Sequence, residues 1–313
     1  MLRNFRGENE SIRIRAGFGY DPTILLYYEH PYLFRKQNIY FSGEVFYQNA
    51  LNKSNIAEHI YGGDFKQKFI GGYLDFGNRF NIYNKIDLQL GYYYIETPQY
   101  FPGISASGHR IDHQFTIGLS YAYDTRDLAQ FPSIGTYAFS MIQFKGLGID
   151  GINYQVINFD LREYFKILKE LRIKGRITSR LTYGKLVPYY DYSFIGYQER
   201  IRGHYNQIEE GNDYYIGSVE LNYPVIKDMN VNLNFVPIIP NSLLSYRFAF
   251  YLELFMDSGT ALMKNQRLDF NNFKSGYGGG LIFLILPYNI LRIEYALGQQ
   301  KHSEWILGLG LSF

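Results

Sequence analysis

The sequence predicts an all-β protein, an antiparallel transmembrane β-barrel of about 14 strands. The first observation behind this prediction is the end of the chain, 304–313, where large apolar residues alternate with mostly small ones. A period of two with one apolar face is typical of a barrel strand that has lipid on one side and a crowded or wet interior on the other. The apolar face of this closing strand consists of Trp305, Leu307, Leu309, Leu311 and Phe313.

The amino-acid composition is the second observation. Aromatic residues make up 19% of the 313 residues, with 32 Tyr and 25 Phe, and barrels concentrate such rings at the two boundaries between lipid and water. No segment approaches the run of about 20 apolar residues that a membrane-spanning helix needs. The net charge of +2 gives no reason to expect a nucleic acid as partner. The absence of Cys suits passage through an oxidising periplasm.

The third observation is a series of alternating segments that recur about every 22 residues, as expected for strands joined by short turns on one side and longer loops on the other. From the amino terminus onward, the predicted strands lie at 11–20, 23–34, 38–49, 64–78, 85–96, 111–124, 134–146, 152–166, 170–184, 214–226, 243–257, 273–287, 289–299 and 304–313. In the eighth segment the apolar positions change face between Val156 and Ile157, which indicates a β-bulge or a misplaced boundary.

The alternation is clearest in 115–124 and 171–183. In 171–183 one face is apolar and the other face carries Arg172, Lys174, Arg176 and Arg180. A cation that faces lipid costs a few kcal/mol at the bilayer centre, so we expect these four side chains to line a lumen. The alternative is a soluble β-sandwich with one solvated face. The aromatic content and the apolar closing strand argue against that alternative.

The connection 185–213 differs from the other connections in its length. It contains Pro188, several tyrosines and many charged residues. A structureless loop of this length in a compact domain is usually functional. Within this connection the segment 201–205 reads Ile201, Arg202, Gly203, His204 and Tyr205.

Segment 201–205 resembles the (Val/Ile)-Arg-Gly-(Phe/Tyr) motif of the BamA/TamA-like outer-membrane barrel-assembly family, the bacterial surface antigens. His204 stands where the family has the aromatic residue, and Tyr205 follows one place later. Further segments resemble family motifs in the expected order. They are Asn4 to Gly7, Glu29 to Phe34, Asp124 to Asp127 with Pro132 and Gly135, Val219 to Leu221 with Pro224, Phe255 to Gly259, and Gly276 to Gly280 followed by Pro287 and by Arg292 to Ala296.

The resemblance covers nearly the whole chain, 1–313, as a single transmembrane barrel domain. It implies a 16-stranded family barrel, of which the 14 predicted segments are strands three to sixteen. The first two strands, the periplasmic POTRA domains and a signal peptide would then precede Met1, since the residues from Met1 to Gly7 are too few and too polar for a signal peptide. We therefore expect the chain to be amino-terminally truncated and unable to insert substrates alone.

The resemblance places the connection 185–213 inside the barrel. A guanidinium in a lumen needs a carboxylate partner, and its planar fork suits bidentate pairing. Glu220 and Asp257 are the candidates, because their alternation with apolar neighbours predicts that both face inward. We expect Arg202 to pair with one or both and to pin the loop to the wall. The alternative is a lumenal ion-pair network of purely structural value.

The turn motif consists of Asp124, Arg126, Asp127, Pro132 and Gly135. We interpret it as a turn, in which Asp bonds to the backbone and Pro and Gly set the dihedral angles. Direct contact with a substrate is the alternative. The run Gly276 to Gly280 lacks the Lys-Ser/Thr and the helix of a phosphate loop, so we interpret it as a strand kept thin for loop packing.

We expect neither an enzyme nor a cofactor. The sequence contains no Gly-x-Ser-x-Gly elbow. His109 and His113 precede a strand and have no Cys beside them, so we expect no metal site.

The resemblance implies the barrel of an insertase or translocation pore in the bacterial outer membrane, which assembles or exports β-barrel or surface proteins. Its partners would be outer-membrane lipid, nascent outer-membrane proteins as substrates, and accessory lipoproteins. Two alternatives remain open. One is a passive porin-like channel, with the cations at 172, 174, 176 and 180 as selectivity residues. The other is the barrel carrier of a secreted lipase-like passenger.

Overall fold

The computed structural model describes residues 2–4, 6–167, 170–232, 245–286, 289–299 and 302–313. These residues form one antiparallel sheet of 15 strands, in which each strand pairs with its neighbours along the chain. The strands of this sheet are β1 (Leu2–Arg3), β2 (Ser11–Gly17), β3 (Thr23–Phe34), β4 (Ile39–Leu51), β5 (Lys66–Arg79), β6 (Asn84–Glu96), β7 (Ile111–Asp124), β8 (Gly135–Lys145), β9 (Tyr154–Lys166), β10 (Arg172–Gly184), β13 (Asp213–Asn232), β14 (Ser245–Leu262), β15 (Lys274–Leu286), β16 (Asn289–Gly298) and β17 (Ser303–Leu309).

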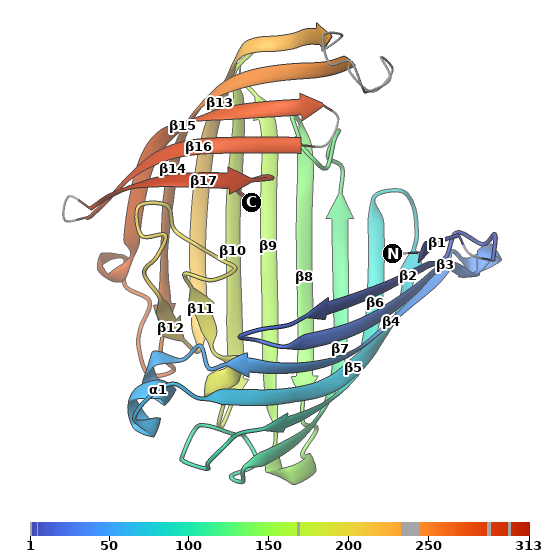
Figure 1. Cartoon of the computed structure of the whole chain (residues 1–313), viewed down its shortest axis with the longest axis vertical. Coiled ribbons are helices and arrows are strands. Elements are labelled where there is room, and N and C mark those ends of the chain that lie inside the picture. The colour runs from blue at the N-terminus through green and yellow to red at the C-terminus, as the bar shows by residue number, and fades with distance from the viewer. Residues whose placement is uncertain (1, 5, 168–169, 233–244, 287–288, 300–301) are drawn as a thin grey trace.

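The sheet wraps around an interior (Figure 1). Strands β14–β17 and β2–β5 curve forward from the two sides, and the segment with β11 (Ser193–Ile195) and β12 (Glu209–Gly211) lies between them in this view. The helical elements of the described residues are the helix α1 (Asn55–Tyr61) and the single turns η1 (Arg35–Gln37), η2 (Ile149–Gly151), η3 (Tyr189–Asp191) and η5 (Phe270–Asn272). No helix in the described ranges is long and apolar enough to cross a membrane.

The sheet has one strand more than the sequence predicted, because the two residues of β1 pair with Ser11 and Ile12 of β2. Strands β13 and β14 are longer than predicted, with 20 and 18 residues. The predicted strand residues 243–244 and 287 lie outside the described residues. The expected irregularity near Val156 is absent from the described register, since β9 pairs with β8 and β10 without a shift. Val156 and Ile157 both lie within β9, so a misplaced boundary does not explain the change of face either. Val156 is apolar on the inward face because it packs there in a buried cluster with Ile152, Tyr154 and Val187.

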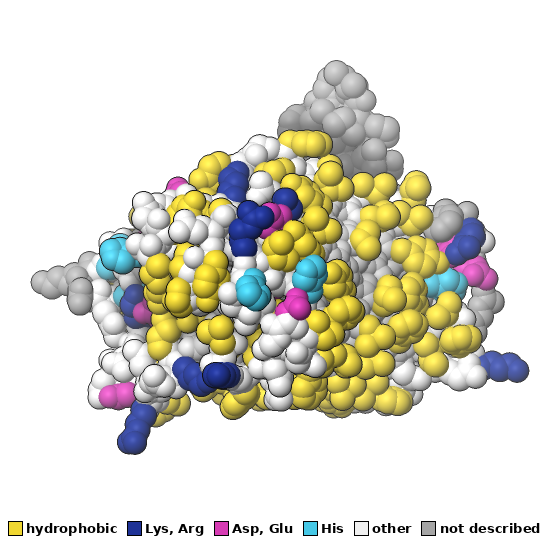
Figure 2. All heavy atoms as spheres, turned by 90° about the horizontal axis from the view of Figure 1, so that it is seen from below, with side chains coloured by type: hydrophobic (Ala, Val, Ile, Leu, Met, Phe, Trp, Pro, Cys, Tyr) yellow, Lys and Arg dark blue, Asp and Glu magenta, His cyan; other side chains and the backbone are white. Residues whose placement is uncertain are grey.

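The two faces of the sheet differ as the alternation predicts. On the outward face, large apolar side chains are exposed, for example Ile177 at 60% and Leu254 at 61%. On the inward face of the same strands, Lys174 and Glu253 are buried at 2% exposure. Figure 2 shows hydrophobic side chains over much of the visible surface, with charged groups in a small cluster and along the margins. Such an apolar outer face fits a lipid environment.

The closing strand is shorter than predicted, and this corrects the assignment of Leu311 and Phe313 to the outward face. Strand β17 ends at Leu309, and Gly310 adopts a φ of 87°, which turns the chain out of the sheet. Leu311 then packs on a buried interior cluster, and the Arg176 guanidinium lies 5.9 Å from the centre of the Phe313 ring. Alternation over 304–313 continues past Gly310 in the sequence, but the backbone does not remain a strand.

Trp305 offers a direct test of the outward face, because it is the one Trp of the chain and its side chain is 75% exposed. We expect lipids with brominated acyl chains to quench its fluorescence strongly in liposomes. The matched variant moves the ring by one residue, with Trp305→Phe and Ile306→Trp, since Ile306 is 5% exposed and faces inward. Equal quenching of the two proteins would contradict the orientation of β17.

Candidate functional site

The connection between β10 and β13 folds onto the inner face of the sheet. It contains η3 and the two strands β11 and β12, which pair with each other as a small antiparallel sheet. Ile195 of β11 and Ile201 form a buried cluster with Tyr214 and Ile216 of β13. The connection therefore has its own secondary structure and an apolar contact with the wall.

Asp191 in η3 anchors the first part of this connection. Its carboxylate accepts hydrogen bonds from Lys145 Nζ at 2.7 Å, Arg180 Nη2 at 2.6 Å and the Tyr154 hydroxyl at 2.7 Å. Burial raises the pKa of the Asp191 carboxyl, but Lys145 and Arg180 lower it by more, so this pKa lies below its ordinary value. Wall strands β8, β9 and β10 thus hold the start of the connection through one carboxylate.

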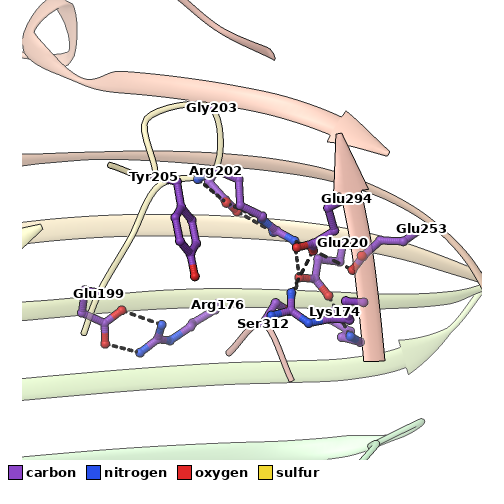
Figure 3. A network of polar contacts seen from close by, with 12 residues as sticks. Lys174, Arg176, Glu199, Arg202, Gly203, Tyr205, Glu220, Glu253, Glu294 and Ser312 are labelled. Atoms are coloured by element: carbon purple, nitrogen blue, oxygen red, sulfur yellow. Dashed lines mark hydrogen bonds and ion pairs between the residues drawn. The ribbon is translucent and has the colours of Figure 1, made fainter. Parts of the chain in front are cut away.

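Arg202 is the centre of a second, larger network (Figure 3). Its Nε and Nη2 atoms donate to the two carboxylate oxygens of Asp257 at 2.6 and 2.8 Å. Its Nη1 atom lies 2.9 Å from Glu220 Oε1 and donates to Glu294 Oε1 at 3.0 Å. These carboxylates come from β14, β13 and β16, and the Arg202 side chain is 6% exposed. One guanidinium therefore joins the connection to three wall strands.

The carboxylates around Arg202 have other partners. Lys174 Nζ donates to Glu220 Oε2 at 2.7 Å, and Arg292 Nη1 donates to Glu294 Oε1 at 2.8 Å. Ser312 Oγ donates to Glu220 Oε1. Burial disfavours a charged guanidinium, but the neighbouring Glu220 and Asp257 carboxylates raise the pKa of Arg202 well above its ordinary value. Arg202 is therefore a permanent cation in this site.

Glu253 is the least satisfied member of the network. Its Oε1 atom lies 3.8 Å from Arg202 Nη1, and neither carboxylate oxygen has a hydrogen-bond partner among the described residues. Arg202 is the one cation among the described residues within ion-pair distance of Glu253.

The backbone of segment 201–205 lies directly on the wall because the wall has glycines there. A Cβ added at Gly276 of β15 would overlap the Arg202 carbonyl oxygen, and one added at Gly298 of β16 would overlap the Gly203 carbonyl oxygen. Gly203 itself has a φ of 91°, which favours glycine. Glycine is therefore needed on both sides of this contact.

Two further contacts fix the end of segment 201–205. The His204 ring is buried, with Nδ1 at 3.0 Å from Gln207 Oε1 and Nε2 at 3.2 Å from the Ser275 carbonyl oxygen. The Tyr205 ring packs on an interior cluster that includes Phe255, and the Arg200 guanidinium lies 4.1 Å from its centre. The imidazole thus occupies a buried site on β15.

The comparisons with known proteins concern the family and the fold. The model of the Omp85 superfamily domain matches residues 4–313. The chain belongs to the Omp85 superfamily. Among solved structures, it is similar to BamA from Haemophilus ducreyi lacking POTRA domains 1–3, with a TM-score of 0.71 and 18% identity, over 99% of this chain and 65% of that chain.

A second similar structure is CdiB from Acinetobacter baumannii, with a TM-score of 0.51 and 13% identity, over 99% of this chain and 54% of that chain. The chain thus spans less than two thirds of each of these two structures. At these identities the likeness concerns the fold. No curated protein sequence matches this Omp85 chain.

The turn motif of the Omp85 chain forms a compact turn between β7 and β8. Arg126 pairs with both oxygens of Asp124 at 2.8 and 2.7 Å. The Asp127 carboxylate accepts from the backbone N–H of Ser133 at 2.8 Å. Gly135 has a φ of 112° and follows the buried Pro132. No described hydrogen bond or ion pair links this turn to Arg202, but Phe131 within the turn packs on an interior cluster with Tyr251 and Ile282.

Three acidic residues of this Omp85 chain were not predicted from the sequence to lie at the Arg202 segment, namely Glu253, Glu294 and Glu304. Glu294 alternates with Ile293 and Tyr295 in the same way as Glu220 alternates with its neighbours. This pattern signals that Glu294 faces inward. It does not reveal which inward carboxylates meet, because that depends on the register of four strands.

The described residues contain one group with metal-ligand spacing, Glu8, Glu10 and His30, whose ligand atoms lie within 4.8 Å of one another. Arg6 Nε already donates to Glu10 Oε1 at 2.9 Å, and the Tyr28 hydroxyl donates to the same oxygen at 2.8 Å. Glu10 therefore has a cationic partner from its own chain, and we assign no metal to this group.

Proposed function

We propose that this Omp85 chain is the barrel of a protein insertase or translocation pore in the bacterial outer membrane. Omp85 membership and the BamA and CdiB likenesses support an outer-membrane insertase or secretion barrel in general terms. The observation that carries the proposal is Arg202, which holds the folded-in connection against Glu220, Asp257 and Glu294. Its substrates would be nascent outer-membrane proteins, and lipid and accessory lipoproteins its other partners.

The proposed mechanism uses the backbone and involves no bond chemistry. Among the described strands, β17 pairs with β16 and with no strand on its other side. Unpaired N–H and C=O groups of an edge strand are a template for the addition of another strand. Each such group costs several kcal/mol when it faces hydrocarbon, so pairing with an incoming strand is favourable. We propose that nascent strands add at such an edge.

The ion pairs of the interior favour this function over a passive porin-like channel. Three of the four cations expected to line the lumen are already paired, Lys174 with Glu220, Arg176 with Asp160 and Glu199, and Arg180 with Asp191. Two of these acidic partners, Glu199 and Asp191, belong to the folded-in connection. Paired cations covered by a connection are poorly placed to select solutes.

The protein, reconstituted in liposomes, provides the test. We expect it to accelerate the folding of a urea-denatured outer-membrane barrel, measured by protease protection, relative to protein-free liposomes. A sugar-flux assay on the same liposomes addresses the channel alternative.

The variant Arg202→Ala separates the two functions. We expect it to reduce the acceleration while the protein remains in the liposomes. Rapid sugar flux without accelerated folding, unchanged in Arg202→Ala, would overturn the proposed function in favour of a channel.

A further inference from the structure

Glu304 is a second point of attachment for segment 201–205, on a strand that Arg202 does not reach. The Glu304 Oε1 atom accepts a hydrogen bond from Gly203 N at 2.7 Å and another from Tyr205 N at 2.9 Å. Glu304 lies on β17, opposite Ala296 of β16, and its side chain is 11% exposed. One carboxylate oxygen thus serves two backbone donors of the segment.

These two hydrogen bonds differ from the contacts of Arg202. The Arg202 carboxylates come from β13, β14 and β16. Among the described residues, the polar contacts between β17 and segment 201–205 come from Glu304 alone. The two N–H groups have no other described acceptor, and a buried donor without an acceptor is costly.

We propose that Glu304 couples the docking of segment 201–205 to the position of the edge strand β17. When β17 moves relative to β16, the Glu304 carboxylate leaves the two N–H groups, and the segment loses its polar attachment to β17. Release of the segment in turn removes the donors that hold the Glu304 side chain. Coupling between two sites is reciprocal by thermodynamic necessity.

Glu304 is a positioning residue in this proposal. The consequence for function rests on the proposed insertase role, in which an incoming strand adds at the edge of β17. The folded-in connection would then respond to strand addition through Glu304. An acidic side chain is suited to linking β17 to segment 201–205, because charge-assisted hydrogen bonds to backbone N–H groups are strong and directional.

The test uses a single cysteine as reporter of docking. The chain has no Cys, and Ile201 is 1% exposed, so Ile201→Cys gives a unique thiol that is buried while the segment is docked. The rate of its reaction with a maleimide reports how often the segment opens. Heat-dependent migration in gel electrophoresis verifies that each variant has a folded barrel.

In this background we expect Glu304→Ala to raise the labelling rate at least about tenfold, as expected for losing hydrogen bonds to a charged acceptor. Glu304→Gln keeps an acceptor oxygen at the same place but loses the charge, so its rate should lie between those of the parent and Glu304→Ala. Ser303→Ala, on the opposite face of β17, should not change the rate. A parent-like rate for Glu304→Ala, or equal rates for the Ala and Gln variants, would overturn the proposal.

Two further measurements keep the test decisive. If Glu304→Ala does not fold, Glu304→Asp takes its place, because it shortens the side chain by one methylene. This variant should still raise the labelling rate, and a parent-like rate would overturn the proposal.

Trp305 adjoins Glu304 and reports on β17. We expect Arg202→Ala to shift the fluorescence emission of Trp305 when it is introduced into the parent protein, and not when it is introduced into Glu304→Ala. Equal shifts in the two proteins would contradict the coupling. Labelling is independent of insertion, so the failure of either idea can be recognised separately.

Discussion

Replacing Arg202 by alanine is expected to destabilise the protein by about 3 to 5 kcal/mol, because it removes the cation shared by several buried carboxylates. Glu220 retains Lys174 and Glu294 retains Arg292, but Asp257 loses its bidentate partner and Glu253 its nearest cation. The measurement is the urea midpoint of unfolding in detergent, followed by the fluorescence of Trp305.

Arg200→Ala is the matched control. Arg200 lies two residues away, donates to the Tyr197 carbonyl oxygen and stacks on the Tyr205 ring, and no described ion pair involves it. We expect this control to cost less than about 1 kcal/mol, as is usual for exposed or single neutral contacts. Similar unfolding midpoints for the two variants would contradict the assigned role of Arg202.

Replacing Gly276 by alanine is the second change with a large expected effect. Its Cβ would overlap the Arg202 carbonyl oxygen, which is backbone and cannot move aside as a flexible side chain would. We expect the segment to be displaced from the wall and the urea midpoint to fall nearly as far as in Arg202→Ala. Gly175→Ala is the control, because a Cβ there meets no atom within 4 Å.

The two changes should not be additive. Once Arg202→Ala has released the segment, the space at Gly276 is no longer occupied, so adding Gly276→Ala should cost little more. A double-mutant cycle on the urea midpoints measures this coupling. Additive losses would show that Gly276→Ala disturbs the wall itself and that the segment does not depend on the close approach.

The architecture of the sheet could be predicted from the sequence because a strand is a local pattern. Alternation with a period of two identifies the strands and their two faces from side chains near each other in the chain. It located the 14 longer strands of the sheet and placed Lys174, Glu220 and Asp257 on the inward face, where the structure also has them. The two-residue β1 was missed because such a short strand shows no alternation.

The error at the closing strand has a physical cause. The alternating pattern persists to Phe313, but Gly310 has a positive φ and changes the direction of the backbone. Alternation in the sequence gives no information about this φ. Leu311 packs in the interior against an apolar cluster that includes Phe131 from the distant β7–β8 turn. Such a contact depends on how the whole sheet curves.

The sequence by itself determined the strands, their faces and the inward orientation of the residues around the long connection. Only the tertiary structure decided which inward residues meet. Arg202 is separated from Glu294 by 92 residues of chain, and Gly203 from Glu304 by 101. Their meeting depends on the register of neighbouring strands and on the glycines that let the segment approach. Strand identity arises from local periodicity, whereas the site arises from register and curvature summed over the whole sheet.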